Sequence, residues 1–221
     1  MNSENEVIPV PHVESTPWRL DLWLRKRILW VFLLALLLFI LGALLSHIWL
    51  VNNPESAGEY FSLLSKIIRN KIPAGAEGPS LFLAVFINNL KASAFMVGLG
   101  LIPFLVLPAF GLLANGVGIG IVTSMVQLKG QNVLMMLLVG IVPHGIIEIP
   151  AFVLSGSLGI YMSIQFSKFI LMGLRSETEP PLQLVKRILK TWLFVVVPLL
   201  SLAALIESYI TPILLKGFLL R

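Results

Sequence analysis

The sequence predicts an all-α, polytopic transmembrane helix bundle with five to six membrane segments, broken helices and a short amphipathic surface helix. Hydrophobic residues make up 57% of the 221-residue chain and charged residues only 12%, about half the charged share of a typical soluble domain. The mean hydropathy of +0.93 agrees with this pattern. A soluble protein of this length needs far more charge to cover its surface. We therefore expect a multi-pass protein of a cell membrane, surrounded by membrane lipids.

The charged residues are kept apart from the apolar runs. Those that fall inside long apolar stretches are Lys91, Glu148 and Glu207. The net charge of +5 is expected in the connections, where basic residues face anionic headgroups. No basic surface with interleaved aromatic residues supports nucleic-acid binding. Because the chain has no cysteine, disulfides and thiolate metal sites are excluded.

The polar segments divide the chain into its parts. Residues 1–27 are expected to form a cytoplasmic tail and an interfacial segment, since tryptophan and basic residues occur together just before the first apolar run. Residues 28–214 are expected to form a single transmembrane domain with polar loops at about 52–80 and 172–190, followed by a short C-terminal tail at 215–221. Within 52–80, apolar residues recur at helical spacing and predict an amphipathic helix on the membrane surface.

Most of the apolar runs have the length of one membrane span. The expected single spans are 28–51, about 81–103, about 108–127 and about 191–214. The run at 133–171 has the length of about two elements. We expect it to break near Pro143 and Pro150, because proline removes a helical N–H group and clashes with the preceding turn.

The distribution of basic residues bears on the number of crossings. The cluster before the first span places the N-terminus in the cytoplasm. Six full crossings would put the basic loop at 172–190 outside, against the positive-inside rule. We therefore favour five crossings with 133–146 as a re-entrant or short helix, which returns this loop to the cytoplasm and leaves the C-terminus outside. Six crossings remain the alternative.

Ionisable side chains at membrane depth cost about 2.5–3.5 kcal/mol each on insertion scales, so each calls for a partner. His144 and Glu148 are spaced i, i+4 and share one helix face, and Glu207 lies in the last span. We expect these three to converge in the bundle interior, either as ligands of a divalent metal such as zinc or as a hydrogen-bonded network without metal. The other members expected in this buried polar network are Asn88, Asn89, Lys91, Ser93 and Thr211.

Small residues repeat every four positions in three places. These ladders are Ala94/Gly98, Gly116/Gly120/Ser124 and Ala151/Ser155/Gly159. Such ladders allow two membrane helices to approach closely. Because the second and third ladders exceed what one short bundle obviously needs, we expect a homodimer.

Four stretches together resemble the stage II sporulation protein M family of integral membrane proteins. They are Phe86–Ala92 (FINNLKA), Ala114–Gly116 (ANG), Pro143–Ala151 (PHGIIEIPA) and Ala204–Pro212 (ALIESYITP). The resemblance extends over about residues 28–214, and its most specific part is the proline-flanked stretch with His144 and Glu148. It implies a membrane protein that acts with partner proteins which remodel peptidoglycan, in a family that also occurs in prokaryotes that make no spores.

These observations lead to one main expectation of function and one alternative. The main expectation is a membrane scaffold or partner subunit for cell-envelope remodelling, with no enzymatic activity of its own. An intramembrane metal-dependent hydrolase is disfavoured because the sequence has no H-E-x-x-H pair. The alternative is a transporter or channel subunit whose site lies at the broken helices near the bilayer midplane. A role driven by ATP would need a separate ATPase partner, since no nucleotide-binding motif is present.

Overall fold

The computed structural model describes residues 22–73, 75–172 and 180–219, and all regular structure in these ranges is helical. The α-helices are α1 (Leu22–Val51), α2 (Pro54–Lys71), α3 (Pro79–Leu99), α4 (Pro108–Leu128), α5 (Val133–Met136), α6 (Val142–Met172), α7 (Pro181–Thr191), α8 (Val197–Leu205) and α9 (Thr211–Leu219). Three short π-helical turns join some of them: η1 (Leu137–Ile141), η3 (Trp192–Val196) and η4 (Ile206–Ile210). Residues 1–21 of the predicted N-terminal segment and residues 173–179 of the predicted 172–190 loop lie outside the described residues. Residues 22–27 belong to α1, and the part of the predicted loop from Pro181 onward is the helix α7.

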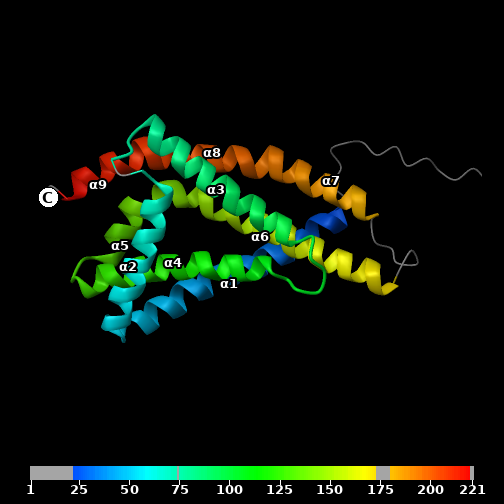
Figure 1. Cartoon of the computed structure of the whole chain (residues 1–221), viewed down its shortest axis with the longest axis horizontal. Coiled ribbons are helices and arrows are strands. Elements are labelled where there is room, and N and C mark those ends of the chain that lie inside the picture. Colours follow the sequence, from blue (N-terminus) through cyan, green and yellow to red (C-terminus); the bar gives the residue numbers. More distant parts are fainter. Residues whose placement is uncertain (1–21, 74, 173–179, 220–221) are drawn as a thin grey trace, which may run out of the picture.

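Five helical stretches are long and apolar enough to cross a membrane. They are Ile28–Val51, Pro79–Leu99, Pro108–Leu128, Val133–Met172 and Pro181–Gly217. In Figure 1 the first turn of α1 lies at the same end of the bundle as the last turn of α6 and the first turn of α7, whereas α2, the α4–α5 turn and α9 lie at the opposite end. The chain therefore runs through the bundle five times, and the predicted helical membrane fold is confirmed.

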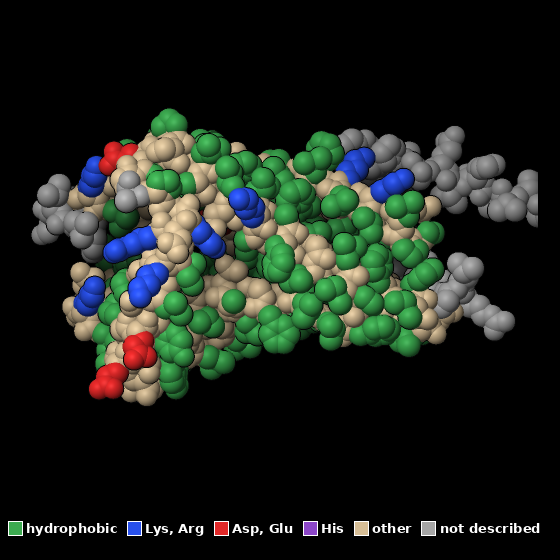
Figure 2. Space-filling model, in the orientation of Figure 1, with side chains coloured by type: hydrophobic (Ala, Val, Ile, Leu, Met, Phe, Trp, Pro, Cys, Tyr) green, Lys and Arg blue, Asp and Glu red, His purple; other side chains and the backbone are tan. Residues whose placement is uncertain are grey.

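The surface of the bundle matches a membrane environment. Figure 2 shows hydrophobic side chains over most of the middle of this face, with most Lys and Arg side chains toward the two ends. Large apolar side chains on the outside of α1 and α6 are exposed, among them Trp30, Leu45 and Ile146. Apolar side chains that face outward over the length of a span are stable only against lipid.

The amphipathic surface helix predicted within 52–80 corresponds to α2, which crosses one end of the bundle (Figure 1). Its apolar side packs on the ends of α1 and α4, where Ala57 lies in a small core with Leu50 and Ile121. The Trp49 and Tyr60 rings meet edge to face at 6.3 Å between centroids. This packing holds α2 across the bundle end, where a helix with one charged face is expected to lie in the headgroup region.

The expected re-entrant segment at 133–146 is wrong, because α5, η1 and α6 form one continuous helix from Val133 to Met172. The helix does not break at Pro143 because the turn before it is widened. The Val142 N–H donates to the Leu137 carbonyl, a π-type bond five residues back. Proline has no N–H and its ring clashes with the carbonyl four residues earlier, and a π turn accommodates both effects without ending the helix.

The same pairing of a π turn with a proline recurs in the last span. The N–H groups of Val197 and Thr211 donate to carbonyls five residues back, at the ends of η3 and η4, and Pro198 and Pro212 follow directly. By contrast Pro150 lies within regular α-helix. Proline at membrane depth therefore modifies these helices locally and does not divide them.

The closest helix packing is between α1 and α4, and it depends on glycine. A Cβ on Gly116 would overlap the Phe39 carbonyl, and one on Gly120 would overlap the Ser46 hydroxyl. On the facing helix, a Cβ on Gly42 would lie 2.7 Å from the Leu113 carbonyl oxygen. The third ladder is used in the same way, since a Cβ on Gly159 would overlap the Met96 carbonyl of α3. Both ladders that suggested a homodimer are thus occupied by contacts within the chain.

This packing predicts opposite effects for two neighbouring glycines of α4. We expect Gly116→Ala to lower stability by about 1–3 kcal/mol, the usual cost of overpacking, because α1 and α4 must move apart. Gly118→Ala is the matched control, because a Cβ at Gly118 meets nothing within 4 Å and alanine favours the helix by about 1 kcal/mol. Thermal unfolding in mild detergent, followed by tryptophan fluorescence, measures both. Equal thermal midpoints for the two variants would contradict the packing.

The direction of the five crossings predicts an accessibility pattern. Cysteines introduced singly at Ser3 and Thr178 should react with an impermeant thiol reagent from the same side of the membrane, and a cysteine at Gln131 from the opposite side. The native chain has no cysteine, so the unmodified protein is the blank. Reaction of Thr178→Cys and Gln131→Cys from one side would show an even number of crossings between them and refute this topology.

Candidate metal centre

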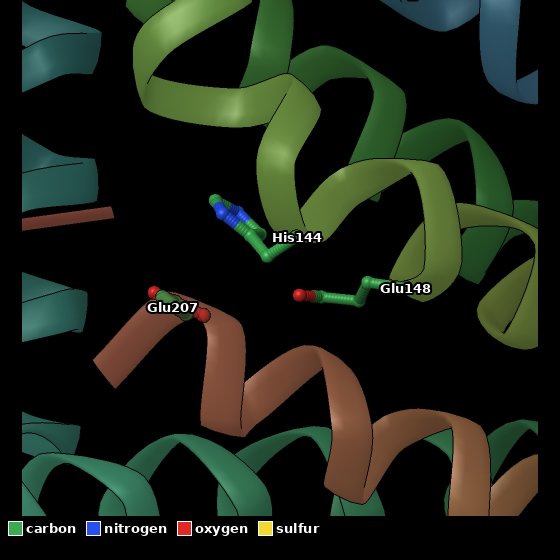
Figure 3. A group of neighbouring side chains, drawn as sticks. All are labelled: His144, Glu148 and Glu207. Carbon is green, nitrogen blue, oxygen red and sulfur yellow. The ribbon is translucent and has the colours of Figure 1, made fainter. Parts of the chain in front are cut away.

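Three ionisable side chains from two membrane spans meet inside the bundle. His144 and Glu148 lie one turn apart on α6, and Glu207 lies in η4 (Figure 3). One ligand atom from each lies within 4.8 Å of the other two, and all three residues are half-buried. In Figure 3 the Glu148 and Glu207 side chains point into the gap between the two helices, beside the His144 ring.

The π turns help to place these groups. His144 comes three residues after the end of η1, and Glu207 lies within η4 itself. A π turn inserts an additional residue into a helix and so rotates the following side chains relative to the preceding ones. The side chains of His144 and Glu207 therefore take their directions from the same local features that accommodate Pro143 and Pro212.

Thr211 supports the histidine. Its hydroxyl lies 3.4 Å from His144 Nδ1 and is also 3.4 Å from the Ile206 carbonyl, to which it donates. The hydroxyl oxygen can then accept a hydrogen bond from Nδ1–H. This arrangement leaves Nε2 with its lone pair, as in metal sites where the second ring nitrogen of a histidine ligand is held by a polar neighbour.

Asn89 brings a third span to the cluster. It is buried on α3, and its side chain lies close enough to the Glu148 carboxyl to interact with it. The Asn88 amide in turn donates to Asn89 Oδ1 at 3.2 Å. The structure therefore places these two amides beside one carboxylate of the cluster.

Two other predicted members of the network lie elsewhere. Ser93 is fully buried, but its hydroxyl donates to the Leu90 carbonyl and accepts from Trp192 Nε1 at 3.2 Å. Lys91 is exposed on the outside of α3. A separation of two residues on a helix is about 200°, so Lys91 faces away from Asn89. The expectation that Lys91 joins the buried network is therefore corrected.

The cluster has the composition of a cation site. Two carboxylates lie close together at membrane depth, and within the described residues neither forms an ion pair with Lys or Arg. One imidazole and two carboxylates are suitable ligands for zinc and similar divalent ions. Ligand atoms of a tetrahedral zinc lie about 3.3 Å apart given bonds of about 2.0 Å. Small rotations of the three side chains would bring their ligand atoms to this spacing.

A cavity of about 180 Å³ borders the centre on the side of α1 and α4. His144 and Glu148 form part of its wall, and Asn115 of α4 contributes a further polar group. Asn115 is exposed, and its amide nitrogen donates to the Gly111 carbonyl at 2.8 Å. The sequence analysis did not include Asn115 among the site residues, although an amide in the middle of an apolar span is the same signal that identified Asn88 and Asn89.

Comparison with known proteins places this arrangement in a family. The chain is 30% identical to the uncharacterized protein MJ0793 of Methanocaldococcus jannaschii over 182 residues, covering 81% of this chain and 93% of that protein. It is 28% identical to the uncharacterized protein MJ0706 of the same organism, covering 96% of this chain and 91% of that protein. No solved structure matches the chain significantly. The family model for stage II sporulation protein M matches residues 31–212, a range that includes His144, Glu148 and Glu207, and the chain belongs to this family.

Proposed function

We propose that this protein is a membrane scaffold or partner subunit for cell-envelope remodelling, stabilised by a divalent cation such as zinc at His144, Glu148 and Glu207. The observation that carries the proposal is the convergence of one imidazole and two carboxylates, with ligand atoms within 4.8 Å, inside a helical membrane bundle. The N-terminus is assigned to the cytoplasm on the positive-inside rule.

Electrostatics favours a cation in this cluster. Bringing two carboxylates together at membrane depth costs free energy both from dehydration and from their mutual repulsion. A divalent ion offsets both charges and uses the histidine lone pair as a third ligand. It would also join α6 to the last span, so that metal binding would contribute directly to the stability of the bundle.

The envelope role is supported by membership of the stage II sporulation protein M family. The curated relatives are uncharacterized and assign no more specific role. A scaffold function agrees with the architecture, in which nearly all described residues belong to one membrane bundle and its surface helix. Chemical work on the envelope, in this proposal, is done by partner proteins.

The cavity beside the centre favours a transporter or channel subunit as the alternative function. It is polar at Asn115, His144 and Glu148 and lies between membrane spans. A divalent-cation pathway through it would give flux into proteoliposomes that carry a fluorescent metal indicator. Asn115→Leu, which narrows the cavity, and Glu148→Gln should both abolish that flux. A scaffold predicts no flux above that of protein-free vesicles.

The metal content of the purified protein tests the main proposal. We expect about one divalent ion per chain in mild detergent, measured by inductively coupled plasma mass spectrometry after removal of free metal. Glu148→Gln keeps the size of the side chain but removes its charge, and should lower the metal content at least tenfold. His47→Gln is the matched control, because His47 bonds to Thr123 on α4 at 2.9 Å and takes no part in the cluster.

The thermal stability of the same samples separates the metal site from a simple hydrogen-bonded network. If the ion binds the folded chain at 100 times its dissociation constant, it contributes about 2.7 kcal/mol, so chelation should lower the thermal midpoint of the wild type but not of Glu148→Gln. A network without metal predicts a loss of about 1–2 kcal/mol for Glu148→Gln and no effect of chelators on either protein. The second result, together with metal-free wild type, would refute the metal site.

A further inference from the structure

Lys91 is an exposed cation in the middle of a membrane span. It lies on α3 about 18 Å from Pro79 and about 12 Å from Leu99 along the helix axis, at 1.5 Å per residue. No hydrogen bond or ion pair joins it to any other described residue. A lysine that faces hydrocarbon at this depth is costly unless it is paired, so a partner outside the described part of the chain is expected.

The surroundings of Lys91 make it difficult for its side chain to snorkel to the headgroup region. Helical side chains lean toward the N-terminal end of their helix, which for Lys91 is the more distant end at Pro79. At the other end the apolar surface continues beyond Leu99. The exposed apolar residues there are Leu101, Ile102, Phe104 and Leu105. Lys91 is therefore well inside the apolar belt in both directions.

The face of α3 next to Lys91 is shaped for another helix. Ala94 and Gly98 follow on the same face and are both exposed. Of the three small-residue ladders, this one is left open at its glycine, since a Cβ on Gly98 meets nothing within 4 Å. Beside it lies an apolar cavity of about 150 Å³ between α3 and α7, lined by Ala94 and Gly98 together with Leu189 and Trp192. This volume suits one large apolar side chain.

We propose that this face of α3 is the docking site for a transmembrane helix of another protein, one that carries an aspartate or glutamate at the depth of Lys91. The carboxylate pairs with Lys91, the helix backbone approaches over Ala94 and Gly98, and an apolar side chain of the same helix fills the adjacent cavity. The inference rests on the proposed function only in treating the chain as a partner subunit, and it does not depend on the metal centre.

A second copy of this chain is a poor occupant of the site. Its described carboxylates outside the metal centre are Glu55, Glu59 and Glu77, which lie in α2 and just before α3. These positions are at the bundle end (Figure 1), well away from the level of Lys91. Glu148 and Glu207 are at membrane depth but point into the interior (Figure 3). None of the carboxylates in the described part of the chain is therefore placed to pair with Lys91 of a second copy, and we assign the complementary charge to a different protein.

The experiment uses a defined transmembrane peptide as the probe. The full chain, labelled with a donor dye at Gln131→Cys, is reconstituted in phosphatidylcholine vesicles with a leucine–alanine helix of about 20 residues that carries one central glutamate and an acceptor dye. An otherwise identical peptide has glutamine at the centre. We expect energy transfer to show association of the glutamate peptide that is about fivefold or more tighter than that of the glutamine peptide, the scale of a polar pair between membrane helices.

Variants of the chain assign this preference to the proposed face. Lys91→Met should abolish the difference between the two peptides, and Lys91→Arg should retain it. Gly98→Leu should weaken the association of both peptides, because the leucine side chain prevents a helix from packing closely on α3. Gly118→Leu is the control on α4, since a Cβ at Gly118 also meets nothing within 4 Å. Metal content measured on Lys91→Met should equal that of the wild type, which keeps this test separate from the metal centre.

Three results would overturn the proposal. The first is equal association of the glutamate and glutamine peptides with the wild type. The second is a preference for glutamate that survives Lys91→Met. The third is a change in donor fluorescence when anionic lipid is added, present in the wild type, absent in Lys91→Met and unaffected by either peptide. This result would show that Lys91 pairs with a lipid headgroup.

Discussion

Hydrocarbon offers no hydrogen bonds, so every backbone and side-chain polar group within the membrane must be satisfied by the chain or by a bound partner. Proline conflicts with this requirement because it removes a donor and displaces the carbonyl of the previous turn. At three places in the described part of the chain this conflict is resolved by a π turn that ends two residues before the proline. The helices continue through these points, and most of the remaining architecture depends on their doing so.

The position of the candidate metal centre follows from the same constraint. Because the fourth crossing continues through Pro143, His144 and Glu148 are carried on a regular helix and keep their i, i+4 relation. Because the last span widens before Pro212, Glu207 and Thr211 are presented to that helix from the opposite side, with Thr211 against the imidazole. Asn89 on α3 lies beside Glu148, so polar groups of three spans are brought together. Lys91 has no such partner among the described residues, and the docking site proposed above rests on that observation.

Much of this could be predicted from the sequence. Hydropathy and length located the spans, and the amphipathic pattern within 52–80 located α2. The energetic cost of His144, Glu148 and Glu207 at membrane depth was sufficient to predict that they lie together. The helical period of 3.6 residues also separates Lys91 from Asn89, a distinction that the sequence analysis did not apply when it assigned both to one buried network.

Other features could not be predicted because the same local signal has two physical outcomes. A proline inside an apolar run is compatible with a helix break or with a π turn, and only packing against neighbouring spans decides between them. Small-residue ladders show that some helix approaches closely, but not which one. Gly116 and Gly120 pack on α1 of the same chain, whereas Gly98 faces outward. Five crossings were expected with 133–146 as a re-entrant segment. The structure also has five long apolar helices, but in it residues 133–146 are the first part of the continuous fourth one.

The central claim is that the imidazole of His144 and the carboxylates of Glu148 and Glu207 jointly bind one divalent cation inside the membrane. X-ray absorption at the edge of the bound metal, on the detergent-purified chain, tests it most directly. The account predicts a mixed nitrogen and oxygen shell at about 2.0–2.1 Å for zinc, with the outer-shell scattering of one imidazole and no sulfur, and loss of this spectrum in His144→Gln. A shell of oxygen alone without imidazole scattering, or a spectrum unchanged in His144→Gln, would contradict it.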